Sequence, residues 1–570
     1  MHPRTLLTAG LGVLLLFGGC AKAKPSHNQG APLESPWLRQ VRQIFALVPE
    51  TLARNYKTFA GPQGPVSGFG AGDVYPQIWL RDSAWIVDAA AAYYPSASLT
   101  SWLDLHLTMS EKRGRLRDWV APGTAEAFRE WAPRAGQSAG IAFDTNSNES
   151  DQESSAALAL CRMERSEFLE VEADEGARNA RVSRVIAAMD ALARDRTEKK
   201  TGLIWSGLTA DWGDVSPLYP DQRAIYLDAH TPRTLSLYAN VMAYAALQCL
   251  STLEGPKGRR KALAERALKI KEQVRSLFWM PDRGTFRIRR TLDKAPKGFE
   301  DDGQRFALGG NALAVLFGVA DDAQAASVFE AAESLRVLHK FSTISTVLIP
   351  PYAAGVFQHP IMREPFEYQN GGQWDWFGAA LIQAEFERGY SERARLHLGQ
   401  MAARILAKGG NLHEWYAQDG SPKGSPAYAA SAAAIHNVVV KGLLGVSASA
   451  GGLRMILRAG ETMLPFPVPL PVAMGQLVVS QAVSSSAIEV RVNSSAPFKL
   501  KEVCSVLPSG SSPADATGHD PGTPQSVRRI GNDTLVCADL SGPATRGPGP
   551  LQIRFGVKAS SPRVMARGMD

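Results

Sequence analysis

The feature that most limits the fold of this chain is a change of sequence pattern near residue 450. From Pro36 to about Gly445, apolar residues recur at helical spacing in segments separated by long loops rich in Gly and aromatic residues. From Leu453 onward, short runs of aliphatic and β-branched residues lie between Ser, Pro and Gly. The sequence therefore predicts a mainly helical domain over residues 36–448, followed by a small β-rich domain over residues 449–570.

The helical region alternates helix and loop in a way that would suit a ring of helical hairpins. We expect helices at residues 37–56, 83–94, 154–160, 177–194, 232–253, 260–278, 312–319, 323–335, 376–388, 391–406 and 427–443. Strand signals are sparse in this region. With 570 residues, 45% of them hydrophobic, the chain is long enough to bury a large core and a smaller second one.

The first residues of the chain have the pattern of an export signal. Arg4 precedes an apolar run that ends at Phe17 and is too short to span a bilayer comfortably, and small residues then lead to Cys20. Residues 1–20 resemble a bacterial lipoprotein signal, although that signal usually has Leu or another aliphatic residue in place of Phe17. Ordinary secretion, with cleavage near the same point, is the alternative.

The resemblance to a lipoprotein signal implies that Cys20 is lipidated and becomes the new N-terminus. Residues 21–35 are polar, with Pro and Gly, and we expect them to form a tether. The protein would then be anchored by lipid on the periplasmic or cell-surface side of a bacterial membrane, most simply the outer membrane.

Charge and cysteine content exclude some classes of partner. The formal net charge of +7 is small for this length, and the basic stretch at residues 257–261 has the pattern of a solvated helix start, so we expect no nucleic-acid partner. No CxxC or His/Cys cluster is present, and we expect neither metal nor cofactor. Cys504 and Cys537 lie in strand-like runs and form either a disulfide or two buried thiols, whereas Cys161 and Cys249 lie in helical patterns.

Two acidic clusters set among aromatic residues lie about two hundred residues apart, at residues 211–214 (DWGD) and 413–416 (HEWY). A glycosidic bond is broken by one carboxylic acid that protonates the leaving oxygen and one carboxylate that handles water or the anomeric carbon. Aromatic faces hold the C–H surfaces of the sugar. The clusters predict sugar chemistry, with these candidates: Asp211, Asp214 and Glu414 as catalytic residues, and Trp212 and Trp415 as binding residues.

Each acidic cluster also has an ordinary structural interpretation. The loop at residues 211–214 has no regular period, which indicates a shaped loop, and a carboxyl against indole rings would have a raised pKa, as a general acid needs. Asp side chains also stabilise plain turns through hydrogen bonds to the backbone. Glu414 could form an ordinary salt bridge.

Arg81 and Asp82 stand side by side at the start of a predicted helix, with Trp79 just before them. An Arg–Asp pair beside an aromatic ring can hold vicinal sugar hydroxyls through charge-assisted hydrogen bonds. Alternatively, Asp82 caps the helix and Arg81 makes a surface ion pair. All three residues are candidates for substrate binding.

Two further loops come directly before predicted helices. Residues 146–153 are polar and acidic, a pattern that favours helix capping, with Asp151 and Gln152 as reserve binding candidates. Residues 367–376 combine aromatic rings, amides and a carboxylate, which favours either sugar binding or a Gly-rich turn with a capping Asp. The binding candidates in this second loop are Tyr368, Asn370, Gln373, Trp374 and Asp375.

Taken in chain order, these loops resemble those of the six-hairpin (α/α)6-toroid glycosidases, the clan of glucoamylase, trehalase, amylo-α-1,6-glucosidase and related disaccharide phosphorylases. The resemblance covers roughly Pro36 to Gly445. It rests on the motifs WLRDS at residues 79–83, SG at 206–207 with the DWGD loop, YQNGGQWDW at 368–376, and EWY at 414–416. It implies an (α/α)6 toroid, which the β-rich segment would follow as a small sandwich-like domain.

The resemblance also implies a role for each matched residue. Arg81 and Asp82 match the pair that holds the non-reducing sugar in the innermost subsite, and Glu414 matches the general base. The general acid belongs to the loop with Asp211 and Asp214. Trehalase-like motifs place one Asp shortly after Ser-Gly, whereas here three residues intervene and a second Asp follows, so both remain candidates, with a slight preference for Asp211.

The clan works mainly by inversion, which implies carboxyl groups separated by roughly 6.5–9.5 Å. We therefore expect an exported glycoside hydrolase, acting on an oligosaccharide or glycoside substrate, most simply an α-linked glucoside. The alternatives are a glycan-binding lipoprotein without catalysis, a toroid polysaccharide lyase and a disaccharide phosphorylase. The sequence carries no signal of the oligomeric state.

Overall fold

The computed structural model describes residues 34–95, 97–124, 132–165, 175–253, 258–300, 302–449, 452–470, 476–495, 499–513, 525–540 and 549–559. The export signal, Cys20 and almost all of the tether lie outside these ranges, so lipidation and export stay predictions. Within the described ranges, no helix is long and apolar enough to cross a membrane.

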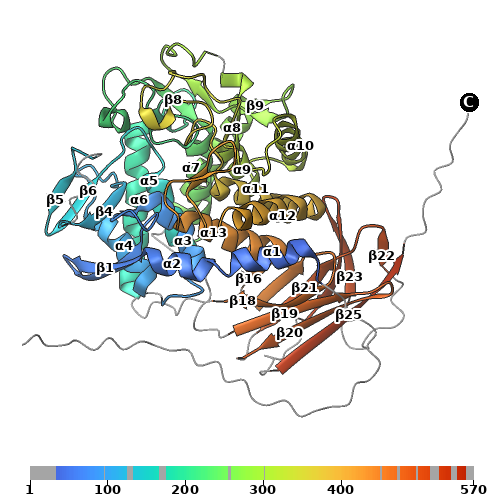
Figure 1. The fold of residues 1–570 in the computed structure, drawn as a ribbon. Coiled ribbons are helices and arrows are strands. Elements are labelled where there is room, and N and C mark those ends of the chain that lie inside the picture. The colour runs from blue at the N-terminus through green and yellow to red at the C-terminus, as the bar shows by residue number, and fades with distance from the viewer. Residues whose placement is uncertain are drawn as a thin grey trace, which may run out of the picture. The chain divides into compact units, whose positions relative to one another are not determined.

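Six helices pack side by side and close into a ring. They are α3 (Leu80–Ala90), α5 (Gln152–Arg165), α7 (Leu237–Leu250), α9 (Leu308–Leu316), α11 (Asp375–Glu387) and α13 (Ala429–Asn437). Each contacts the next in this order, and α13 contacts α3 again (Figure 1). These helices are apolar on nearly every side: in α7 all residues but Gln248 are buried, as expected for a helix with neighbours all round.

A second set of helices lies outside the ring. These are α1 (Pro36–Phe45), α2 (Val48–Asn55), α4 (Ala97–Thr108), α6 (Glu175–Arg196), α8 (Arg259–Phe278), α10 (Asp322–Leu338) and α12 (Ser391–Ala407). They are amphipathic. In α8 the buried residues Leu263, Ala267, Ile270, Val274 and Phe278 recur every three or four positions, and this stripe faces α7.

Most expected helices are present, but several differ in number or bounds, and the one expected at residues 37–56 is two helices, α1 and α2. Residues 97–108 form α4, which the sequence did not indicate because Ser and Thr interrupt its apolar positions. The segment expected at 427–443 changes from α13 to a π-helix, η5 (Val438–Leu443), where the chain leaves the ring. The helix expected from residue 312 begins at Leu308. The sequence indicated a later start because Gly309 and Gly310, which are poor helix formers, lie within its first turn.

Short strands are more common in the helical region than expected, and they shape its loops. Four antiparallel pairs are present: β1 (Tyr56–Gly61) with β2 (Gly64–Phe69), β9 (Trp279–Met280) with β10 (Thr285–Phe286), β12 (Phe306–Ala307) with β13 (Leu348–Ile349), and β14 (Trp415–Tyr416) with β15 (Pro422–Lys423). A three-stranded antiparallel sheet has the order β11 (Arg289–Thr291), β8 (Arg233–Ser236), β7 (Trp205–Gly207). A four-stranded one has the order β3 (Ile78–Trp79), β4 (Trp119–Pro122), β6 (Ile141–Asp144), β5 (Gly136–Ser138). Runs of two to six residues are too short to show a clear alternation.

The C-terminal part forms two five-stranded sheets. One sheet has the order β16 (Ser447–Ser449), β17 (Gly452–Leu457), β21 (Leu500–Val506), β24 (Asp533–Asp539), β23 (Gln525–Ile530). The other has the order β18 (Met463–Pro469), β19 (Gln476–Val483), β20 (Ala487–Ser494), β25 (Gly549–Ala559), β22 (Ser511–Pro513). These strands lie where the sequence pattern changes. Inward residues such as Met455, Phe466 and Val490 join the same buried core as the ring instead of a core of their own.

Two disulfides fix this arrangement. Cys504 lies directly opposite Cys537 on β21 and β24, and the two are bonded, which is one of the two alternatives expected from the sequence. Cys161 of α5 is bonded to Cys249 of α7, two neighbouring helices of the ring. The sequence did not indicate this second pair, because it joins helices that are 88 residues apart.

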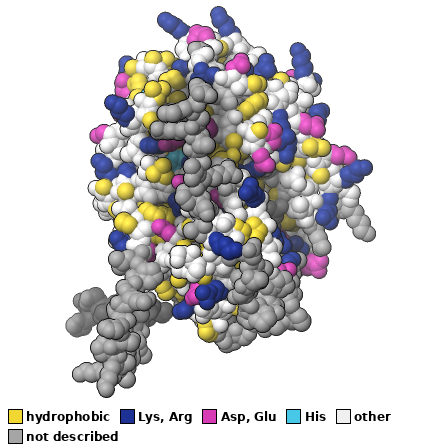
Figure 2. All heavy atoms as spheres, turned by 90° about the vertical axis from the view of Figure 1, so that its right-hand side faces the viewer, with side chains coloured by type: hydrophobic (Ala, Val, Ile, Leu, Met, Phe, Trp, Pro, Cys, Tyr) yellow, Lys and Arg dark blue, Asp and Glu magenta, His cyan; other side chains and the backbone are white. Residues whose placement is uncertain are grey.

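The surface carries mixed charge on the side turned toward the viewer in Figure 2. Lys and Arg side chains there are scattered among Asp and Glu instead of forming one large basic area. Elsewhere in the described chain, surface cations form ion pairs such as Arg223–Asp221 and Arg233–Asp293.

Candidate active site

The loops singled out in the sequence lie at the same end of the ring. Arg81 and Asp82 are in the first turn of α3, Asp151 immediately precedes α5, and Tyr428 immediately precedes α13. Arg81 bonds to Asp151, and Tyr428 bonds to Asp82. The N-terminal ends of these helices therefore meet, and the loops before them surround one site.

Arg81 is the centre of charge in this site. Its guanidinium contacts three carboxylates: Asp151 (Nε to Oδ2, 2.7 Å), Glu149 (Nη2 to Oε2, 2.6 Å) and Asp214 (Nη1 to Oδ1, 2.7 Å). These acids hold the pKa of Arg81 well above its usual value, against the effect of burial. One cation among three acids leaves a local excess of negative charge.

Part of that excess is removed by protonation. Burial raises the pKa of Glu149 and of the nearby Asp118 well above the usual carboxyl range, and other carboxylates around them raise it further. Burial also raises the pKa of Asp82 to about 6, although the hydroxyl of Tyr428 donates a hydrogen bond of 2.7 Å to its Oδ1. These carboxyls therefore bind a proton more readily than exposed ones do.

Asp214 is the carboxylate most open to solvent in this group. Its side chain is 28% exposed, against 2% for Asp151 and 4% for Glu149. Burial alone would raise its pKa, but Arg81 and hydrogen bonds, including one from Gln369, hold the pKa below the usual value. Tyr368 also donates to Asp214, from its hydroxyl to Oδ2 at 3.2 Å.

Glu414 is held from two sides. The hydroxyl of Tyr75 donates to its Oε2 at 2.9 Å, and the backbone N–H of Ser425 donates to the same oxygen at 3.0 Å. The short β14–β15 hairpin places Ser425 opposite Glu414. Burial raises the pKa of Glu414 to about 7, and the charges of Asp82 and Asp214 add to this rise.

The loop at residues 368–373 joins the two acids. Gln369 donates from its side-chain amide to Oδ2 of Asp214 and accepts from the backbone N–H of Asp214, both at 3.0 Å. A few residues on, Gln373 exchanges two backbone hydrogen bonds of 2.8 Å with Tyr416, directly after the Glu414 loop. One loop thus sets the positions of Asp214 and Glu414 relative to each other.

Glycine and strained backbone shape these loops. Gly424 has φ +65°, and a Cβ there would lie 2.5 Å from Oε2 of Glu414. A Cβ on Gly213 would lie 2.5 Å from the carbonyl oxygen of Ala210. Tyr368 has φ +44°, which is unusual for a large side chain and is found chiefly where surrounding structure imposes it.

Aromatic rings lie around the acids. Tyr75, Trp79 and Tyr368 are partly exposed, whereas Trp415 is 8% exposed and its ring lies 6.0 Å from that of Tyr368. Partly exposed rings next to carboxylates could stack on the faces of a sugar. The binding roles of Trp79 and Trp415, which are sequence neighbours of Asp82 and Glu414, stay predictions.

Asp211 is bonded to α9 and lines the same small pocket as Arg81, Glu149 and Asp151. It is 7% exposed, has φ +44°, and its Oδ2 accepts a hydrogen bond of 3.0 Å from the N–H of Gly310 in the first turn of α9. Burial raises its pKa to about 7, and the neighbours that affect it are Gly309, Gly310 and Arg289. The slight preference for Asp211 as the general acid stays a prediction, and the charge of Asp214 is among those that raise the pKa of Glu414.

Other expected binding residues are engaged inside the protein. Trp212 and Trp374 are only 3% and 1% exposed, and their rings pack edge to face at 4.7 Å. We therefore correct the prediction that these two rings contact a sugar, because almost none of their surface is exposed to solvent.

The polar members of the same loop form internal bonds. Asn370 bonds to the backbone of Tyr352, Gln373 to the carbonyl of Ala417, and Asp375 forms a buried ion pair with Arg404. As whole residues, Asn370, Gln373 and Asp375 are at most 2% exposed. Their geometry is that of supports for the loop and not of groups that face a substrate.

The sequence interpretation missed three residues of the site. Tyr75 stands five positions before Leu80 in an aromatic-rich segment, Asp118 follows Arg117 and precedes Trp119 much as Asp82 follows Arg81, and Glu149 lies in the segment interpreted as a cap. The Arg-Asp-Trp pattern at residues 117–119 is the signal that could have found Asp118. The reserve candidate Asp151 does bind Arg81, and the amide of Gln152 donates to Glu149 at 3.2 Å.

The described residues offer little to a metal ion. Their one close group of potential ligands is Glu502, Cys504 and Cys537, in the β-rich part. Both cysteines of this group are in a disulfide, so neither is available as a thiolate.

Comparisons with known proteins add to this picture. No protein-family model matches the chain, and no curated protein matches its sequence. Solved structures do match. A GH63 mannosylglycerate hydrolase from Thermus thermophilus, in complex with glucose, is 15% identical and matches over 68% of this chain and 98% of its own, with a TM-score of 0.50.

Two rhamnosidases match over more of this chain. An α-L-rhamnosidase from Streptomyces avermitilis, complexed with L-rhamnose, is 12% identical over 92% of this chain and 41% of its own, with a TM-score of 0.52. A GH78 rhamnosidase from Bacillus sp. GL1 is 16% identical over 85% and 43%, with a TM-score of 0.53. The chain shares the fold of these glycoside hydrolases. It spans less than half the length of both rhamnosidases, and at such identities the likeness concerns the fold alone.

Proposed function

We propose that this protein is a glycoside hydrolase of the (α/α)6-toroid type, with Asp214 and Glu414 as its catalytic pair. The observation that carries the proposal is the grouping of these two carboxyls at one end of a closed helical ring, joined by the 368–373 loop. Arg81 and Asp82 lie next to them and can hold sugar hydroxyls. The fold shared with GH63 and GH78 enzymes supports it.

In this proposal Asp214 protonates the leaving oxygen and Glu414 activates a water on the opposite face of the sugar, as the loop order implies. Burial alone would raise the pKa of Asp214, and Arg81 opposes that effect. A sugar hydroxyl that takes the place of Asp214 on Arg81 would therefore let Asp214 gain a proton. Glu414, whose pKa is about 7, would have to lose one.

The pKa order of the unliganded protein favours the reverse roles, with Glu414 as the acid. Both assignments require one proton shared between the two carboxyls, so both give the same bell-shaped dependence of kcat/KM on pH. We expect kcat/KM to fall as the pH rises through about 7, where Glu414 loses its proton. The pH profile is the same for both assignments, whereas the response to the leaving group differs.

The roles are tested with two glucosides that differ only in the leaving group. Loss of a general acid harms a substrate with a poor leaving group, such as a disaccharide, far more than one with a good leaving group, such as a glycosyl fluoride. Loss of the base harms both. We expect Asp214→Asn to keep much of its activity on the fluoride and Glu414→Gln to lose it on both. The opposite pattern assigns the acid to Glu414.

We further propose that the enzyme inverts the anomeric carbon and acts on an α-linked glucoside or oligosaccharide outside the cytoplasm, anchored through Cys20. Proton NMR of the first product during turnover of α-linked disaccharides tests the stereochemistry, and a β-anomer is expected. An α-anomer would contradict inversion. Turnover that requires phosphate would indicate a phosphorylase, and a product with near-ultraviolet absorption would indicate a lyase.

A further inference from the structure

A second cavity, of about 790 Å³, lies at the end of the ring opposite to Arg81 and Glu414. Its walls come from the later turns of the ring helices and from η5, and residues of the β-rich part close it. Lining residues include Trp85, Leu158, Tyr244, Phe317, Val440 and Leu470. The volume falls in the range of roughly 300–1,000 Å³ that is typical of small-molecule sites.

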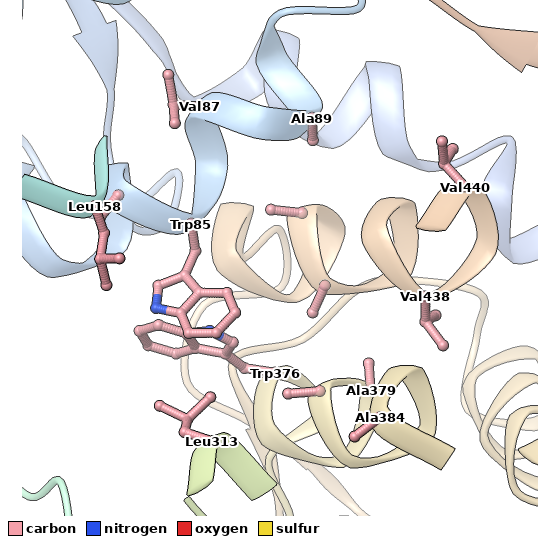
Figure 3. Close-up of a cluster of buried hydrophobic side chains, with 14 of the residues drawn as sticks. Trp85, Val87, Ala89, Leu158, Leu313, Trp376, Ala379, Ala384, Val438 and Val440 are labelled. Atoms are coloured by element: carbon pink, nitrogen blue, oxygen red, sulfur yellow. The ribbon is translucent and has the colours of Figure 1, made fainter. Parts of the chain in front are cut away.

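A stack of aromatic rings separates this cavity from the proposed catalytic end. Trp85 packs edge to face on Trp376 at 5.8 Å, Trp376 lies 5.8 Å from Trp212, and Trp212 packs on Trp374 at 4.7 Å. Figure 3 shows the indoles of Trp85 and Trp376 against each other, with Leu313 beside them. A sugar bound beside Asp214 cannot extend through this stack, so the second cavity is a separate site.

The cavity has an excess of positive charge. Its described lining contains three cations, Arg162, Lys441 and Arg458, and two acids, Asp88 and Glu387. Lys441 (Nζ) and Arg162 (Nε) both contact Oδ2 of Asp88, at 2.7 and 3.1 Å, so two cations share one carboxylate.

The other two charged groups do not restore neutrality. Arg458 donates to the carbonyl oxygen of Gly442. Burial raises the pKa of Glu387, and Glu387 accepts a hydrogen bond of 2.7 Å from Gln383. Because Arg458 lies near the charges of Glu387 and Asp533, the excess positive charge is concentrated at Lys441 and Arg162, which share Asp88.

The rest of the lining is mostly apolar, and it contains two unused hydrogen-bonding groups. The indole N–H of Trp85 and Nε2 of His436 have no hydrogen-bond partner in the described part of the chain, and both side chains are more than nine-tenths buried. Unpaired polar groups of this kind are rare in the interior of a protein. A ligand that fills this space needs an apolar body and a head group that binds to cations.

We propose that this cavity binds a small amphipathic anion, an apolar chain or ring with one carboxylate or phosphate group. The head group binds near Lys441 and Arg162, and the apolar body lies against Trp85, Leu158 and Phe317. Neither the head-group contact nor the apolar contact depends on the proposed glycosidase activity. The site needs the helical ring and the β-rich part together, because both contribute to its walls.

The test measures binding by calorimetry to probes that share a ten-carbon chain and differ in the head group. Decanoate and decyl phosphate are expected to bind at one site at least about tenfold more tightly than decyltrimethylammonium, and acetate is expected not to bind. Preference for one of the two anions identifies the head group. Equal binding of anion and cation would overturn the proposal.

Variants locate the binding. Lys441→Met is expected to weaken decanoate binding about tenfold and Lys441→Arg to retain it, while Lys269→Met, at an exposed position of α8, is the control. Ala245→Phe and, from the β side, Leu470→Trp fill the cavity and are expected to abolish binding, with folding checked by thermal unfolding. Unchanged decanoate binding in a folded cavity-filling variant would place the ligand elsewhere and refute the site.

Discussion

The proton affinity of each carboxyl in the active-site group depends on one or two neighbouring side chains. Asp214 and Glu414 are both acids in buried surroundings, yet Arg81 lowers the pKa of Asp214, while Glu414 has only neutral donors and a raised pKa. The sequence indicated Glu414 through the resemblance of its loop. It could not separate Asp211 from Asp214, because the contact of Asp211 with Gly310 joins positions 99 residues apart.

Removal of the Tyr75 hydroxyl tests the environment of Glu414. This hydroxyl donates to the carboxylate and so lowers its pKa, against the effect of burial. In Tyr75→Phe the pKa of Glu414 should rise by roughly one unit, since a hydrogen bond to a charged group contributes about 1.5–3 kcal/mol. The alkaline limb of the kcat/KM profile should shift to higher pH. The surface control Tyr219→Phe should leave the alkaline limb unshifted. An unshifted limb in Tyr75→Phe as well would show that the pKa of Glu414 does not determine this limb.

Gly424 offers a second test at this scale, with a matched control. Gly424 and Gly410 have nearly equal φ values of +65° and +68°, but a Cβ on Gly424 would lie 2.5 Å from Oε2 of Glu414, while a Cβ on Gly410 meets no atom within 4 Å. Ala at either site should cost about 1–2 kcal/mol of stability. Only Gly424→Ala should also lower kcat/KM, by about a hundredfold. Equal activity in the two variants would contradict the role of Glu414.

At the scale of helices and strands, buried charge fastens α10, α11 and α12 together. His397 of α12 is fully buried and lies between Glu385 of α11 (2.9 Å) and Glu333 of α10 (3.1 Å). Burial alone would lower its pKa, but the two glutamates raise it to about 9. A protonated His397 therefore stabilises the contact between an outer pair of helices and the ring.

This contact predicts how stability depends on pH. The folded pKa of about 9 exceeds the usual value of 6.5, so the contribution is complete below about pH 6.5 and is lost as the pH rises through 9. Its size is about 3 kcal/mol from a difference of about 2.5 pKa units. Urea unfolding at about pH 6 and about pH 9.5, on either side of this window, measures it. His397→Gln should remove most of the difference in unfolding free energy between the two pH values, and the exposed control His339→Gln should not. If both variants keep this difference, His397 is not its source.

Most long elements were predictable from local pattern, with α4 as an exception, and short ones were not. The stripe of α8 follows a helical period over 20 residues, and α7 is a nearly continuous apolar run of 14 residues, so both helices could be inferred. Two-residue strands such as β14 (Trp415–Tyr416) have no period to detect, and their pairing depends on the hairpin that holds Glu414. The local sequence therefore indicates where helices form but not how the loops between them are held.

At the scale of the whole molecule, closure of the ring determines where the site lies. The contact of α3 with α13 brings Asp82 to Tyr428, which are 346 positions apart. No local pattern contains that contact, and only the resemblance to toroid glycosidases implied it. The β-rich part could be predicted from composition, but the second cavity between it and the ring could not, since its walls come from every ring helix.

In the proposed function, Asp214, and not Asp211, works with Glu414 to hydrolyse a glycosidic bond. Both Asp→Asn changes conserve shape, and the amide oxygen introduced by Asp211→Asn could still accept the hydrogen bond from Gly310. The most direct measurement is kcat/KM of the wild type, Asp214→Asn and Asp211→Asn on an α-linked glucose disaccharide. We expect a loss of at least about a thousandfold in Asp214→Asn and activity within about tenfold of wild type in Asp211→Asn. Full activity in Asp214→Asn, or the larger loss in Asp211→Asn, would contradict this proposal.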